Sequence, residues 1–248
     1  MQHYQLFIDG AWTDGAEGQV MTSDNPATGA PWATFACASP ADVDRAVAAA
    51  ARALDDPAWR DMTQTARGKL LYRLADLVEQ HAQQIGRIET TDSGKLLAET
   101  SSQTGYVADY YRYFAGLADK IEGAVLPIDK PDMHAFTTRA PIGVVAAIVP
   151  WNAQMFLTAT KLGPALAAGC TVVLKASEMA PAPMLEFARL IEQAGFPPGV
   201  VSVITGDAAG CAIPLTRHRR VDRIAFTVGP ETARQVVRNS AENFAPHG

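Results

Sequence analysis

Apolar residues recur at helical spacing through the first half of the chain. One face of a long amphipathic helix is predicted by Leu70, Leu71, Leu74, Leu77 and Val78. Another helix is expected after Ser39, because Ser39 can cap it, Pro40 suits its first turn and Asp42 places an acid there. A third is expected near residues 107–117. Residues 39 to about 123 are therefore predicted to be mostly helical.

The segment before Ser39 has a different pattern. Turn-forming residues gather at 7–10, Phe-Ile-Asp-Gly, and at 25–29, Asn-Pro-Ala-Thr-Gly. Short strands joined by turns are therefore expected here.

Beyond about residue 135, short β-branched runs alternate with helical stretches. The runs cover residues 143–149, 171–175, 200–205 and 223–227, and their starts are 28, 29 and 23 residues apart. This spacing suits repeated strand-helix-strand units. Gly169 and Gly195 stand where helices should end before the next strand. The fold class predicted is α/β, a Rossmann-like parallel sheet with flanking helices and an N-terminal helical layer packed on it.

In an open parallel sheet the ligand crevice lies at the carboxyl ends of the strands. This rule places residues 150–152, 175–178, Gly206 and 227–229 along one rim. No Gly-x-Gly-x-x-Gly and no Walker-type Gly-Lys-Ser/Thr follows any of the strands. Gly229-Pro230-Glu231 opens a helix whose N-terminus suits a phosphate, although taken alone a plain strand-to-helix turn is the preferred interpretation.

Charge and composition exclude several other functions. A net charge of −5 without a basic run argues against nucleic acid as a partner. The apolar stretches at 142–151 and 162–174 are too short or too interrupted to span a membrane, and the start lacks the pattern of a secretory signal, so a cytoplasmic setting is expected. Three widely spaced cysteines and five scattered histidines predict neither disulfides nor a metal site.

Several consecutive motifs closely resemble those of the aldehyde dehydrogenase superfamily. They are Pro150-Trp151-Asn152, the stretch Lys-Leu-Gly-Pro-Ala-Leu-Ala-Ala-Gly at 161–169, Val-Val-Leu-Lys-Ala-Ser-Glu at 172–178, Gly-Phe-Pro-Pro-Gly-Val at 195–200 and Ala225-Phe226-Thr227. Residues 25–29 and the Thr-Asp-Ser-Gly-Lys at 91–95 also look like that family. The resemblance covers essentially the whole chain. It implies oxidation of an aldehyde to a carboxylate with NAD, and leaves NADP open.

The resemblance gives individual residues a role. Asn152 matches the amide that donates to the oxyanion formed on the aldehyde carbonyl. Lys175 and Glu178 match a pair at the adenosine ribose, where the carboxylate favours NAD over NADP. Phe226 and Thr227 match the strand end beside the nicotinamide half. The other residues assigned to the cofactor crevice are Ile148, Val149, Pro150, Trp151, Ser177, Ala208, Val228 and Gly229, and Asn152 also borders it.

The chain departs from the family pattern at this crevice. Val228-Gly229 stands where Gly-Ser is usual, so the Val228 side chain is expected to reduce cofactor space or to strain a turn that needs a positive φ. Asp207 begins a turn that is usually richer in glycine, and Ala176 replaces a customary proline. Binding of the dinucleotide is therefore expected to be impaired.

The resemblance also implies that the fold is incomplete. The general-base glutamate and the nucleophilic cysteine of the family lie beyond residue 248, so the chain is expected to be the cofactor-binding portion, inactive alone. Structural roles are preferred for Cys37, Cys170 and Cys211. The expected division is residues 1–121 as the helical part, 122–141 as an extended arm for subunit contacts and 142–248 as the Rossmann-like units.

Several partners and one competing function stay open at this stage. The arm favours a homo-oligomer, a separate C-terminal half is a second partner, and a small aldehyde is the substrate of the complete enzyme. A non-catalytic nucleotide-binding or interaction module is the competing function.

Overall fold

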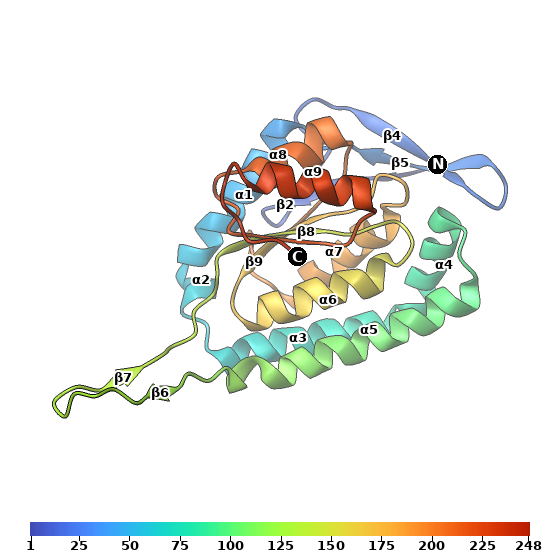
Figure 1. Cartoon of the computed structure of the whole chain (residues 1–248). Helices are drawn as coiled ribbons and strands as arrows, with labels where there is room; N and C mark the ends of the chain where they lie inside the picture. The colour runs from blue at the N-terminus through green and yellow to red at the C-terminus, as the bar shows by residue number, and fades with distance from the viewer.

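A six-stranded mixed sheet forms the centre of the molecule, whose computed structural model describes all 248 residues (Figure 1). The strand order is β11 (Arg223–Phe226), β8 (Val144–Ile148), β9 (Thr171–Lys175), β10 (Val201–Ile204), β2 (Leu6–Ile8) and β3 (Ala11–Thr13). The first four strands are parallel. They coincide with the four predicted β-branched runs, which confirms the prediction of an α/β fold with a parallel core.

Helices cover both faces of this sheet. On one face lie α1 (Pro40–Asp55), α8 (Ile213–Arg217) and α9 (Pro230–Ser240) (Figure 1). On the other lie α6 (Gln154–Ala167) and α7 (Ala182–Ala194), with α3 (Gln64–Gln80) and α5 (Leu97–Leu117) outside them. Every residue of β8, β9 and β10 is buried, as strands between two helical layers require.

The N-terminal helices agree with their sequence signals. Ser39 caps α1, with its hydroxyl accepting from the Asp42 N–H and the Asp42 carboxylate accepting from the Ser39 N–H. The third predicted helix, expected at 107–117, begins ten residues earlier. The sequence did not reveal its first half, Leu-Ala-Glu-Thr-Ser-Ser-Gln-Thr-Gly-Tyr, because that stretch has little apolar periodicity. Further short helices are α2 (Pro57–Arg60), α4 (Ala82–Ser93), η1 (Ala118–Lys120) and the π-helical turn η2 (Ala208–Ala212).

The first 36 residues form short strands, as expected, and these strands belong to two different sheets. β2 and β3 make a hairpin whose two-residue turn, Asp9-Gly10, has positive φ at both positions, and this hairpin adds an antiparallel edge to the central sheet. β1 (Gln2–Tyr4), β5 (Ala30–Ala36) and β4 (Val20–Asn25) form a separate three-stranded sheet. The description of residues 1–121 as the helical part thus fits only the residues from Pro40 onward. The sequence did not reveal which sheet each early strand joins, because that depends on contacts between distant segments.

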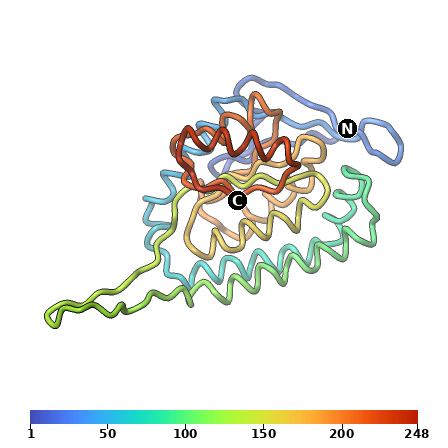
Figure 2. Tube along the Cα trace, in the orientation of Figure 1, coloured from blue at the N-terminus to red at the C-terminus, as the bar shows by residue number.

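Residues 121–143 leave the body of the protein and return to it. Within this segment β6 (Val125–Leu126) pairs antiparallel with β7 (Ala135–Phe136), and the loop projects well away from the helical layers (Figures 1 and 2). Val125 and Phe136 are 81% and 69% exposed, so the arm presents apolar side chains to its surroundings. No helix of the protein combines the length and hydropathy that a membrane crossing needs.

A buried carboxylate joins the outer sheet to the helical layer. Asp92, at the end of α4 and 2% exposed, accepts from the Ser23 hydroxyl at 2.6 Å, from the Trp32 indole N–H at 3.0 Å and from the Ala182 backbone N–H at 2.8 Å. Ser23 and Trp32 belong to β4 and β5, and Ala182 opens α7. One side chain therefore holds three separate elements together.

Replacing Asp92 by alanine leaves these three donors without their acceptor. We expect Asp92→Ala to lower the free energy of unfolding by about 3 kcal/mol or more, because each buried unpaired donor costs about 1–3 kcal/mol. Asp24→Ala, which removes an exposed carboxylate from the same outer sheet, is the matched control and should cost less than about 0.5 kcal/mol. Urea unfolding followed by circular dichroism measures both, and equal losses would contradict the anchoring role.

The stability contribution of Asp92 should also depend on pH. Burial raises the pKa of Asp92, while its bonds from Ser23, Ala182 and Trp32 oppose that shift. The folded protein thus holds this proton more tightly than the unfolded chain, so the contribution is complete below the unfolded pKa and falls as pH rises through the folded pKa. Asp92→Asn cannot ionise, and the fall in unfolding free energy from about pH 4 to neutrality should become smaller. An unchanged pH slope would show that Asp92 does not titrate in this range.

Candidate functional site

The strand register brings the predicted site residues to one edge of the sheet. Phe226 pairs with Ile148, Ile148 pairs with Lys175, and Lys175 pairs with Ile204, so these four residues form one row across the parallel strands. The segments that follow the row, at residues 149–153, 176–178, 205–208 and 227–229, therefore leave the sheet side by side.

A cleft of about 480 Å³ opens at this edge, between the strand ends, η2, α8 and α9. Ten of the residues assigned from the sequence line it: Ile148, Val149, Pro150, Trp151, Lys175, Ser177, Glu178, Ala208, Val228 and Gly229. Apolar and polar side chains both contribute to the wall, as in sites that bind small organic molecules.

Lys175 and Glu178 provide the charges at the rim of the cleft. The Lys175 ammonium, 6% exposed as a side chain, donates to a carboxylate oxygen of Glu178, which is 37% exposed. Both residues line the cleft. The Ser177 hydroxyl accepts from the Met179 backbone N–H at 3.3 Å, which closes the loop after β9.

The start of α9 forms the opposite wall. Gly229 is its N-cap residue with φ −69° and ψ 162°, and no side chain caps the helix, so its first N–H groups lack side-chain acceptors. Val228 packs partly buried against the core on the α1 face. The expected positive φ at Val228 is wrong: the only non-glycine residues with positive φ are Asp9 and Phe244. Backbone strain at Val228 is therefore absent, and volume is its one remaining effect on the cleft.

Sequence reasoning missed most of the helical wall. One face of α9 and the turns of η2 and α8 complete the cleft with Ala212, Ile213, Thr216, Glu231, Thr232, Gln235, Val236 and Asn239. The positions 232, 235, 236 and 239 recur at the spacing of a single helix face, which was the available signal. Asp207, by contrast, does not line the cleft, because its carboxylate accepts from the Gly210 N–H at 2.6 Å and caps η2.

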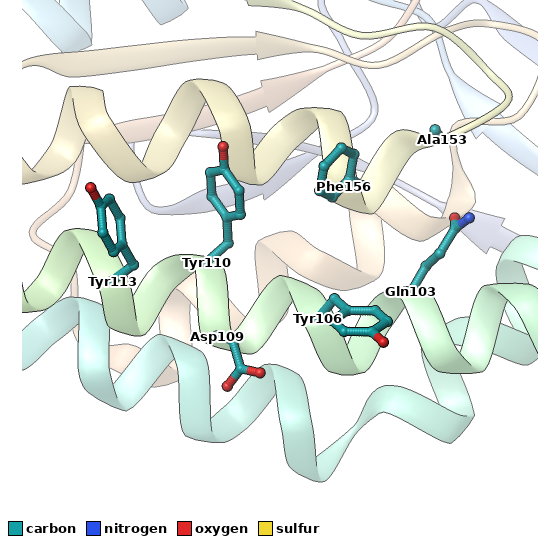
Figure 3. Close-up of a pocket in the computed structure, with 7 residues that line it drawn as sticks. All are labelled: Gln103, Tyr106, Asp109, Tyr110, Tyr113, Ala153 and Phe156. Carbon is teal, nitrogen blue, oxygen red and sulfur yellow. The ribbon is translucent and has the colours of Figure 1, made fainter.

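The segment after β8 separates this cleft from a second one. Pro150 and Trp151 line the cleft just described, whereas Ala153 lines a groove between α5 and α6 (Figure 3). Asn152 lies between them in the chain and is exposed. The following residue, Gln154, is fully buried and donates its amide to the Ala180 carbonyl at 2.9 Å, which fixes the end of the segment. Asn152 itself lines neither cavity, although the residues before and after it, Trp151 and Ala153, line one cavity each.

Phe226 and Thr227, which the sequence assigned to the cofactor, do not line the cofactor cleft. They line a neighbouring cavity of about 480 Å³, with Lys161 of α6. The Lys161 ammonium donates to the Thr227 hydroxyl at 2.7 Å, and burial lowers the pKa of Lys161 to about 8. Sequence reasoning gave Lys161 no separate role, although it belongs to one of the quoted motifs.

None of the cysteines has the surroundings of a nucleophile. Cys170 and Cys211 are buried, and burial raises the pKa of Cys211 to about 12, so its thiol stays neutral despite its place near a helix start. Burial and the nearby Asp207 also raise the pKa of Cys37. The structural interpretation of all three agrees with these environments.

Comparison with known proteins identifies the family. The model of the aldehyde dehydrogenase family matches residues 12–247. A protein of Acinetobacter baylyi named (Z)-2-((N-methylformamido)methylene)-5-hydroxybutyrolactone dehydrogenase is 61% identical over 99% of this chain and 50% of its own length. Aldehyde dehydrogenase 1 of Tanacetum cinerariifolium is 40% identical over 98% of this chain and 49% of its own length. The chain spans about half the length of the curated relatives it matches.

Solved structures agree with this result. An NAD+ complex of an aldehyde dehydrogenase from Bacillus cereus superposes with a TM-score of 0.96 at 35% identity, covering 99% of this chain and 50% of that one. Betaine aldehyde dehydrogenase from Staphylococcus aureus in complex with NAD+ gives a TM-score of 0.96 at 33% identity, covering 98% and 48%. The chain therefore belongs to the aldehyde dehydrogenase family, and its fold corresponds to about half of the complete family structures.

Proposed function

We propose that this chain is the cofactor-binding portion of an NAD-dependent aldehyde dehydrogenase, with NAD held in the cleft at the carboxyl edge of the sheet. One observation carries the proposal: ten residues assigned to the cofactor from four separate segments line a single cleft of about 480 Å³. The NAD+ complexes of structures that match 98–99% of this chain support the same choice of cofactor.

The residues of the cleft suit the adenosine half of a dinucleotide. Ile148, Val149 and Val236 offer an apolar wall to a flat ring. The Glu178 carboxylate, steadied by Lys175, accepts from the ribose hydroxyls and repels a 2′-phosphate. The uncapped start of α9 at Gly229 supplies N–H donors and a positive helix end for phosphate oxygens. NAD supplies the hydride acceptor of the reaction.

Asn152 is the proposed catalytic residue of this portion. Its side-chain amide donates to the oxygen of the aldehyde as negative charge develops there, a contribution of roughly 10²–10³ in rate for donors of this kind. Its position in the chain suits this role, because the residue before it lines the cofactor cleft and the residue after it lines the α5–α6 groove. The cysteine nucleophile and the glutamate base belong, on this proposal, to the length of the relatives that these residues do not match.

The substrate we propose is an aldehyde of the class named in the Acinetobacter relative. A 5-hydroxybutyrolactone is the ring-closed form of an aldehyde acid, so its oxidation is the same chemical reaction. The 61% identity over 99% of the chain supports this choice over the general aldehyde dehydrogenases at 40% and below.

The projecting arm suggests how the protein assembles. We propose that residues 122–141 contact a second copy of the subunit in the complete, cytoplasmic enzyme. The exposed Val125, Met133 and Phe136 supply the apolar surface that such a contact buries. NADP in place of NAD is disfavoured on this proposal because Glu178 faces the ribose.

Cofactor preference tests the role of Glu178. The unaltered chain should bind NAD more tightly than NADP, and Glu178→Gln should reduce that preference by roughly tenfold, because the neutral amide no longer repels the 2′-phosphate. Glu231→Gln removes another carboxylate that lines the cleft, and should leave the preference unchanged. Isothermal titration calorimetry with both cofactors measures this. Tighter binding of NADP to the unaltered chain would remove Glu178 from the ribose site.

Val228 provides the second test of the cleft. Val228→Ala widens the wall without adding a glycine, so affinity for NAD should rise by a factor of roughly three to ten, or about 0.6–1.4 kcal/mol. Val237→Ala makes the same chemical change on α9 outside the cleft and should not alter affinity. Calorimetric titration of both variants, with thermal unfolding to verify the fold, gives the comparison. Equal affinities in all three proteins would show that Val228 does not limit the cofactor space.

A further inference from the structure

The groove between α5 and α6 has a volume of about 740 Å³, and Ala153 lines it at one end (Figure 3). Seven residues line it: Gln103, Tyr106, Asp109, Tyr110, Tyr113, Ala153 and Phe156. Ala153 follows Asn152 directly, so this end of the groove lies one residue from the proposed oxyanion donor. The groove is therefore the place for the part of a substrate that does not react.

Aromatic rings hold one another in place along this groove. The Tyr110 ring lies edge-on to Phe156 with centroids 5.8 Å apart, and 5.6 Å from the ring of Phe114. Tyr113 packs edge-on to Phe114 at 5.1 Å. Such contacts restrict the rings and present a firm apolar wall that suits a flat group.

A buried ion pair, Glu89 with Lys95, contacts the groove residue Gln103. Glu89 of α4 is 1% exposed, and one of its carboxylate oxygens has no hydrogen-bond partner. Lys95 follows α4, in the Thr-Asp-Ser-Gly-Lys stretch that the proposed function has not used. Its ammonium donates to the other Glu89 oxygen at 3.3 Å and to the side-chain oxygen of Gln103 at 2.6 Å.

This contact determines which way the Gln103 amide faces. An ammonium group has donors and no acceptor, so only the amide oxygen of Gln103 can face Lys95. The NH2 group is then directed away from Lys95, and it makes no hydrogen bond within the chain. Gln103 extends from α5 toward the start of α6, where Ala153 lies (Figure 3). Gln103 thus lines the groove and has a side-chain NH2 group that no other group of the chain uses.

The charges around the groove indicate the kind of acceptor that fits this donor. Asp109 is the one ionisable acid in the lining, and no lysine or arginine belongs to it. A carboxylate ligand would meet repulsion without a compensating cation. An uncharged carbonyl oxygen, of an amide or a lactone, matches the Gln103 NH2 group, which adds to the hydroxyl donors of Tyr106, Tyr110 and Tyr113 in this largely apolar wall.

We propose that Gln103 is a specificity-determining residue that donates from its side-chain NH2 to an amide or lactone carbonyl of the substrate. Lys95 is its positioning residue. The inference rests on the proposed function, because it names the group that this enzyme recognises beyond the reacting aldehyde. The aromatic wall holds the flat part of the same substrate.

Binding of an unreactive probe to the 248-residue chain tests the donor. The probe is an α-(N-methylformamidomethylene)-γ-butyrolactone, which has both carbonyl groups and no oxidisable hydroxyl. The comparison compound is a cyclopentylidene analogue that has the same shape and no carbonyl group. In titrations followed by ligand-observed NMR, Gln103→Leu should weaken binding of the lactone about tenfold and leave that of the hydrocarbon analogue unchanged or tighter.

The matched control is Gln83→Leu, the same change at an exposed position of α4 outside the groove, which should alter neither affinity. Equal weakening of both probes by Gln103→Leu would assign the residue a purely steric role and contradict the proposal. No binding of the lactone to the unaltered chain, or binding indifferent to Gln103→Leu, would also contradict it.

A double-mutant cycle tests the role of Lys95. Lys95→Met combined with Glu89→Gln removes the ion pair as a unit, so no buried charge is left alone. This pair of changes should weaken lactone binding severalfold when Gln103 is present and have no effect in the Gln103→Leu background. Equal weakening in both backgrounds would show that Lys95 does not act through Gln103.

Calorimetry with NAD on the same proteins separates this inference from the proposed function. Retained NAD binding with no discrimination between the two probes would overturn the role of Gln103 alone. Discrimination between the probes without any NAD binding would overturn the proposed function and leave a carbonyl-binding groove.

Discussion

Parallel pairing of β11, β8, β9 and β10 is the constraint on which the candidate site depends. Parallel strands send all their carboxyl ends to the same edge, and the register places Phe226, Ile148, Lys175 and Ile204 in one row there. Segments separated by some 25 residues of helix and turn thereby leave the sheet together. The cleft, its charged pair and the junction at residues 150–153 all follow from this one alignment.

The surrounding helices form two cavities, one at that edge and one between α5 and α6. The start of α9 closes one side of the cofactor cleft, and α5 with α6 forms the second groove. Buried hydrogen bonds fix the chain near both cavities. Gln154 donates to the Ala180 carbonyl, and the N–H of Ala182, the first residue of α7, donates to the Asp92 carboxylate. Position of the site and stability of the fold therefore depend on some of the same hydrogen bonds.

Much of this arrangement could be predicted from the sequence, because strands between two helical layers have continuous β-branched runs and helix starts have capping residues such as Ser39. Lys175 ends a predicted strand and Ser177 and Glu178 follow it, and the family resemblance then gave these residues their role. The α9 wall was missed, since the side that a helix turns toward a ligand is set by its packing. The backbone angle at Val228 and the buried chain from Glu89 to Gln103 likewise depend on contacts between distant segments.

A crystal structure of the chain with NAD tests most directly the claim that the dinucleotide occupies the cleft at the carboxyl edge. The account predicts the adenosine ribose within hydrogen-bond distance of the Glu178 carboxylate, and the phosphates near the start of α9. NAD bound at another surface, with the cleft between Lys175 and Val228 holding only solvent, would contradict it.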